Sequence, residues 1–108
     1  MMENATLITL IENVKQECAI TWDDEDTEAD VQRIIESAAT VLSHKLGVSG
    51  DGRIFTVPGY AKMLFEKYCH YAWNNVLEEF ETNYIRDIIA ARHYYQIKGE
   101  SETEETEG

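Results

Sequence analysis

Six acidic side chains crowd one short stretch of this chain, and they are the first groups whose spacing could hold a calcium ion. A calcium loop between two helices needs oxygen ligands at fixed steps, glycine at its sixth position and glutamate at its twelfth. Counted from Asp24, those two positions hold Ala29 and Ile35. The stretch therefore fails the calcium pattern, and we interpret it as charge that favours the start of a helix. Its members are Asp23, Asp24, Glu25, Asp26, Glu28 and Asp30.

The histidines and the possible nucleophiles are arranged unfavourably for catalysis. His44, His70 and His93 are far apart and fall on three different predicted helices. Ser43 and Cys69 each precede a histidine, but adjacent residues of a helix point about 100° apart and cannot face each other. The sequence therefore predicts no catalytic site.

The cysteines and glycines also lack the patterns of a cofactor site. Cys18 and Cys69 fall on apolar helix faces, and no C-x-x-C pair accompanies them, so we predict two buried thiols. Gly47, Gly50 and Gly52 follow a helix instead of a strand, and no Lys and Ser/Thr of a phosphate-binding loop come after them. We expect no metal and no other cofactor.

The aromatic residues are more informative. Six tyrosines and two tryptophans are more than a single small core requires. Both residue types are favoured at protein interfaces, because they bury a large area and keep a polar tip. The alternative is that most are ordinary core residues whose polar tips reach solvent. We predict protein-interface positions at Trp22, Ile54, Phe55, Val57, Tyr71, Trp73, Tyr94, Tyr95 and Ile97.

Apolar residues at spacings of three and four predict the helices that position these side chains. The first helix covers residues 5–17. The second follows Thr27, an N-cap with Asp30 as its capping-box partner, and ends at Leu46 before the stop signal Gly47. Residues 47–58 are expected to form a flexible loop with a short extended segment.

A third helix opens at Pro58 and Gly59 and continues to residue 77 or 79. Its apolar arc is broad, which suggests contacts on two sides. A break over residues 78–82, with Phe80 pointing inward, precedes a fourth helix over residues 83–94. The predicted inner face of that helix comprises Tyr84, Ile85, Ile88, Ile89 and Arg92.

These elements predict an all-α fold, a small bundle of about four helices. Residues 1–98 form the single domain. Residues 99–108 contain no hydrophobic side chain and are expected to be a disordered acidic tail.

The net charge of −12 narrows the classes of function. Binding to nucleic acid or to an anionic membrane needs clustered Lys and Arg, which this chain lacks. The N-terminus shows no secretory signal, and no apolar run approaches the roughly 18 residues of a membrane span. We therefore expect a soluble intracellular protein with no membrane contact.

The order of these elements over about residues 6–98 resembles the small head-tail connector proteins (adaptor or head-completion proteins) of tailed bacteriophages. The first half shows an acidic turn after Ile20-Thr21-Trp22 and then a helix of the form Val-x-x-Ile-Ile-x-x-Ala from Val31. The second half is similar to connectors from phages of Gram-positive hosts. Its matching residues are Lys67-Tyr68-Cys69-His70-Tyr71, Leu77-Glu78-Glu79-Phe80, Asn83-Tyr84, Ile88 and Arg92.

The resemblance implies a homo-oligomeric ring of about a dozen copies at the head-tail joint of a virion, made in the cytoplasm of a bacterial host. Phage portal protein would lie above the ring and tail-side completion proteins below it. DNA would pass through the lumen without specific binding, and the acidic body agrees with that role. The 47–58 loop and the C-terminal tail would be the segments that reach the portal.

Two other functions remain open from the sequence. The charge of −12 also suits a small acidic regulatory module, or a DNA mimic, that occupies a basic groove of another protein. Such a module would retain basic DNA-binding proteins and lose them steeply as salt is added. A metal-dependent enzyme is the third possibility, and analysis of the metal content of the purified protein would detect it.

Overall fold

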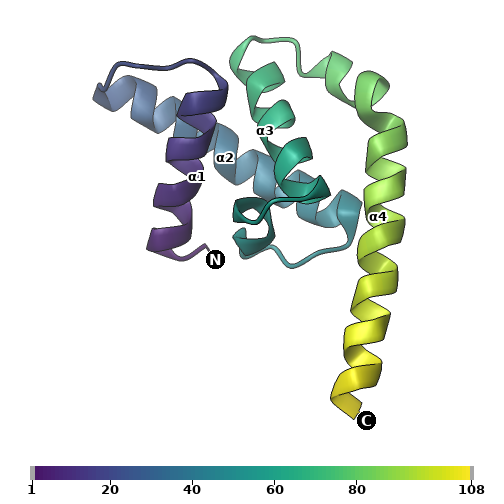
Figure 1. Cartoon of the computed structure of the whole chain (residues 1–108). Helices are drawn as coiled ribbons and strands as arrows, with labels where there is room; N and C mark the ends of the chain where they lie inside the picture. The colour runs from purple at the N-terminus through teal and green to yellow at the C-terminus, as the bar shows by residue number, and fades with distance from the viewer. Residues whose placement is uncertain (1, 108) are drawn as a thin grey trace.

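The computed structural model describes the backbone of residues 2–107 and the side chains of residues 2–98. Within that range the chain forms four α-helices and one 3-10 turn and contains no strand, which confirms the predicted all-α fold. In Figure 1, α2 crosses behind α1 and α3, and α4 runs along one side and continues past the other helices. The elements are α1 (Asn4–Glu17), α2 (Glu25–Leu46), the 3-10 turn η1 (Arg53–Thr56), α3 (Tyr60–Trp73) and α4 (Glu78–Glu107).

Helices α1, α3 and α4 all pack against α2. Its buried apolar residues recur every three or four positions, which is the pattern that predicted the helix. Gly47 follows in the left-handed conformation, with φ of +69°, and ends α2 as predicted. The apolar residues that α2 contributes to the core are Val31, Ile35, Ala38, Ala39, Leu42 and Leu46.

The segment between α2 and α3 differs from the predicted flexible loop with an extended segment. It folds into η1 and places Phe55 in the core, fully buried and stacked on Phe65 with 4.6 Å between ring centroids. Gly52 makes the turn possible with φ of +83°, and the side chain of Met2 packs directly over it. Phe55, which the sequence assigned to a protein interface, instead lies in the core of the described chain, because η1 turns its ring onto Phe65.

The corner between α3 and α4 comes earlier than predicted. Helix α3 ends at Trp73, and α4 already begins at Glu78. Asn75 turns the chain with φ of +60°, a conformation that asparagine tolerates better than most residues. The apolar residues Val76 and Leu77 continued the helical pattern in the sequence but lie in the connection. Phe80 is buried, as predicted.

The inner face of α4 also differs from the prediction in part. Tyr84 and Ile88 face the core, whereas Ile85, Ile89 and Arg92 are exposed. The buried face of α4 starts at Phe80, inside the predicted break. The buried residues therefore lie about one position before the predicted ones. The residues of α4 that pack on the core are Phe80, Tyr84, Ile88, Ala91 and Tyr95.

The backbone of α4 is continuous to Glu107, so the helix does not stop at Gly99. Lengthening an existing helix avoids the cost of starting a new one, which explains why a polar segment can continue it. The side chains from residue 99 onward lie outside the described residues. The expected disorder of this tail therefore stays a prediction.

Candidate protein-interaction site

Four of the nine predicted interface residues come together in one apolar groove between the start of α3 and the second half of α4. Ile54 and Val57 reach it from η1 and the following loop, and Tyr94 and Tyr95 reach it from α4. The cavity has a volume of about 460 Å³, in the size range of pockets that hold ligands. We call it the α3–α4 groove. It is lined by Ile54, Val57, Pro58, Gly59, Tyr60, Met63, Tyr94, Tyr95 and Lys98.

Several of the groove's apolar side chains are unusually exposed. Val57 is 54% exposed and Tyr94 is 42% exposed, and Tyr60 is exposed to a similar extent. The rings of Tyr60 and Tyr94 contact each other across the groove, with centroids 5.7 Å apart. A second cavity shares Ile54 with this groove and extends it toward the 47–53 segment. The aromatic part of the combined depression is the α3–α4 groove, and the extension is lined in part by the polar residues Ser49, Asp51 and Arg53.

Tyr95 joins the two walls of the groove. Its hydroxyl oxygen accepts a hydrogen bond of 2.9 Å from the backbone N–H of Ala61, in the first turn of α3. The N-cap of α3 is Gly59, which has no side chain to accept such a bond. A side chain of α4 therefore caps the start of α3 and fixes the spacing between the walls.

Replacing Tyr95 with phenylalanine should lower the free energy of unfolding by about 1 kcal/mol, because the N–H of Ala61 loses its partner. Chemical denaturation measures this change. Tyr94→Phe is the matched control: it removes a hydroxyl from the neighbouring, exposed tyrosine and should change the stability far less. Equal effects of the two substitutions would contradict the capping role.

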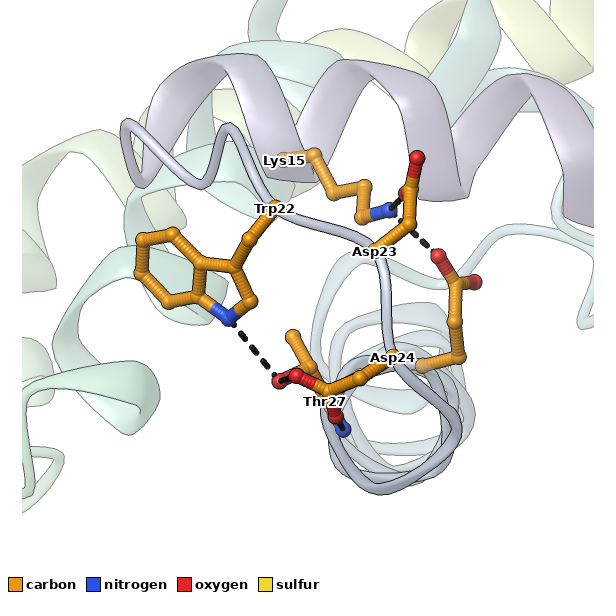
Figure 2. A network of polar contacts seen from close by, with 6 residues as sticks. Lys15, Trp22, Asp23, Asp24 and Thr27 are labelled. Carbon is orange, nitrogen blue, oxygen red and sulfur yellow. Dashed lines mark hydrogen bonds and ion pairs between the residues drawn. The ribbon is translucent and has the colours of Figure 1, made fainter.

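Trp22 lies at a second, separate surface, before the start of α2, where Figure 2 shows its ring extending from the loop. The indole Nε1–H donates to Thr27 Oγ1 at 3.0 Å, and the Thr27 hydroxyl donates to Asp24 Oδ2 at 3.0 Å. These bonds hold the ring in one orientation while 49% of the residue stays exposed. An aromatic side chain that is already ordered loses little entropy when a partner covers it.

Asp24, and not Thr27 as predicted, is the N-cap of α2. Its Oδ1 accepts a hydrogen bond of 2.8 Å from the backbone N–H of Thr27, and the helix begins at Glu25. Thr27 sits one turn further on and is buried under Trp22. The adjacent Lys15 side chain forms ion pairs with Asp23 and Glu28 (Figure 2). The acidic stretch thus serves helix capping and local ion pairing, in line with our interpretation of the sequence.

The cap makes part of the stability depend on pH. Hydrogen bonds from the Thr27 backbone and side chain hold the pKa of Asp24 below its usual value of 3.8. The contribution of a carboxylate with a lowered pKa is present above the pKa of the unfolded chain and is lost as pH falls through the folded value. We therefore expect the melting temperature to fall more in the wild type than in Asp24→Asn between neutral pH and about pH 2.

Asp24→Asn is informative because asparagine keeps the capping oxygen and removes the charge. At neutral pH Asp24→Ala, which removes both, should melt at a lower temperature than Asp24→Asn. If acid lowered the melting temperatures of the wild type and Asp24→Asn by the same amount, that result would contradict this account of the cap.

The remaining predicted interface residues lie elsewhere. Tyr71 and Trp73 are half-buried, and the Tyr71 hydroxyl accepts a hydrogen bond of 3.1 Å from Asn83 at the α3–α4 corner. Ile97 is exposed on α4 but does not line the groove. The nine residues thus divide among the groove, the Trp22 loop, the α3–α4 corner, the exposed surface of α4 and the core.

The structure also exposes four large apolar side chains at positions that the sequence reasoning missed, and one of them is Ile8 on α1. Ile85 and Ile89 lie one turn apart on the outer face of α4, and Ile89 is the most exposed large apolar residue of the described chain at 61%. Tyr60 completes the groove from α3. A helix with isoleucines on two faces gives an ambiguous pattern, and only knowledge of the α3–α4 corner identifies the buried face.

Two of the groups considered for catalysis, Ser43 and His70, contact other parts of the chain. The Ser43 hydroxyl donates to the carbonyl oxygen of Ser49 at 3.2 Å. His70 lies beside Glu17, with 3.4 Å between Nδ1 and Oε2, and Lys67 pairs with the same carboxylate. In the described part of the chain no three His, Cys, Asp or Glu side chains are grouped as metal ligands would be.

Across the same residues, no helix is both long enough and apolar enough to cross a membrane. No protein-family model, curated protein sequence or solved structure matches this chain.

Proposed function

We propose that this chain is a structural assembly protein, a head-tail connector that forms a ring between the portal and the tail of a phage. The observation that carries the proposal is the α3–α4 groove, in which apolar side chains as large as Tyr60 and Tyr94 remain exposed. Contiguous apolar surface on a small soluble domain is typical of a site that another protein covers.

A helical domain of this size has physical reasons to associate. A chain of about 100 residues buries only about two-thirds of its unfolded surface, which leaves it with modest stability alone. Covering the half-exposed Val57, Tyr60 and Tyr94 would add apolar burial at about 25 cal/mol per Å². Subunit contacts in a ring would supply that burial on each copy.

The location in a virion rests on the resemblance described above and on charge. With a net charge of −12, the chain would line a lumen that does not retain DNA phosphates. Portal protein and tail-side completion proteins would be its partners, and the bacterial host cytoplasm would be its place of synthesis. The ordered Trp22 ring is a second anchor for one of these partners.

Native mass spectrometry and sedimentation velocity over a range of concentrations test the proposal, with and without the portal protein encoded in the same genome. We expect a ring, or a monomer that joins a ring when portal is added. Val57→Arg should suppress assembly, whereas Gln16→Arg, which adds the same charge at an exposed position on α1, should not. A strict monomer that ignores portal protein would refute the proposed function.

A further inference from the structure

The second half of α4 is held to the rest of the fold by few contacts. Ala91 is fully buried, but from residue 92 to residue 98 every side chain is exposed except that of Tyr95. Tyr95 is half-buried and is the last described residue that packs against the hydrophobic core. We call residues 92–98 the α4 strap.

The strap lies on the start of α3 through its two tyrosines. The hydroxyl of Tyr95 accepts the hydrogen bond from the backbone N–H of Ala61, and the ring of Tyr94 contacts Tyr60. A single hydrogen bond shifts an equilibrium by only about fivefold, and an exposed aromatic pair contributes a similar amount. The closed position of the strap is therefore weakly held compared with the packing of α2 in the core.

Tyr95 also belongs to two cavities at once. It lines the α3–α4 groove, of about 460 Å³, and the adjoining cavity of about 490 Å³ toward the 47–53 segment. Ile54, a half-buried apolar residue, lines both cavities as well. Because the Tyr95 ring forms part of both walls, moving it away enlarges both cavities and uncovers more of Ile54.

The geometry of the helix limits how the strap can open. Ala91 and Tyr95 are four residues apart, so the N–H of Tyr95 bonds to the carbonyl of Ala91 within α4. Tyr95 cannot leave α3 while Ala91 stays buried unless helical hydrogen bonds beyond Ala91 break. Short helical stretches that no longer pack on a core are marginal in water. Opening of the strap therefore exposes its backbone amides to solvent.

We propose that the α4 strap opens as a separate unit while the rest of the fold stays intact, with Tyr95 as its latch. The α3–α4 groove then alternates between a closed form and a larger open form. Segments with few buried apolar contacts open at a lower free energy than the core, where opening requires global unfolding. This inference concerns a motion within one chain and does not depend on the proposed function.

Hydrogen exchange of backbone amides, followed by NMR on the full chain, tests the separate opening. After correction for intrinsic rates, the amides of residues 95–98 should be protected at least about tenfold less than that of Leu42, which is fully buried in α2. Tyr95→Phe should speed exchange in the strap about fivefold. Tyr94→Phe keeps the ring contact with Tyr60 and should change the exchange far less.

Two glycine substitutions distinguish opening of the strap from unfolding of the whole chain. Gln96→Gly lies at an exposed position inside the strap and should speed exchange of the strap amides about threefold. Arg86→Gly is the matched control, at an exposed position of α4 that stays helical in both forms. It should lower the melting temperature and leave exchange in the strap unchanged. Equal effects of the two substitutions on the strap, or strap amides as protected as that of Leu42, overturn the proposal.

Discussion

Replacing Phe55 with alanine should lower the free energy of unfolding by about 3–5 kcal/mol. The ring is fully buried and stacks on Phe65, so truncation leaves a cavity between η1 and α3. Small domains have a free energy of unfolding of only about 5–15 kcal/mol, so the loss expected for Phe55→Ala would remove much of that stability. Urea denaturation followed by circular dichroism measures the change.

Two control substitutions make this result specific. Phe55→Leu keeps most of the volume and should cost clearly less than Phe55→Ala. Val57→Ala, two residues away and exposed, should leave the stability within about 0.5 kcal/mol of the wild type. If Phe55→Ala left the stability unchanged and abolished assembly, the original assignment of Phe55 to an interface would be right and its place in the core wrong.

The two thiols should react far more slowly in the folded protein than in the unfolded chain. Burial raises the pKa of Cys18 from its ordinary value of 9.0 to about 11. Because the thiolate is the reactive form, this shift lowers its population about 100-fold at pH 8. Burial raises the pKa of Cys69 as well, and its side chain is fully enclosed.

Reaction with a thiol-specific dye, monitored by absorbance, measures these rates one cysteine at a time. The Cys69→Ala chain reports on Cys18, and the Cys18→Ser chain reports on Cys69. Cys69 should react only at the rate at which the fold opens, and both thiols should react fully in urea. Fast labelling of Cys69 in the native protein would contradict its position in the core.

The predictability of the fold differs from element to element for physical reasons. Helix α2 was accurately predicted at its C-terminal end, because Gly47 is a local signal that needs no tertiary context. Its start was displaced, because Asp24 and Thr27 are both good caps and only the structure shows which oxygen reaches a backbone N–H. The burial of Phe55 has no local signal, since it depends on the position of Phe65.

The candidate site was predicted in part for similar reasons. Tyr94 and Tyr95 were assigned to an interface as aromatic residues at the end of a predicted helix. Helix α4 continues past them, but both line the groove. Ile85 and Ile89 were assigned to the core, because the periodicity of α4 fits two overlapping stripes. The stripe that starts at Phe80 is the buried one, and the Asn74–Asn75 corner decides this through the direction in which α4 leaves α3.

The corner between α3 and α4 also determines whether α4 packs on the core of its own chain or of another copy. Only the connection from Asn74 to Leu77 separates α3 from α4, and Asn75 holds the turn with a positive φ. Were all four residues of this connection helical, α3 and α4 would join into one rod of 48 residues, roughly 70 Å long. The buried stripe of α4 would then cover the core of another copy. The bend over residues 74–77 therefore keeps α4 against the core of its own chain.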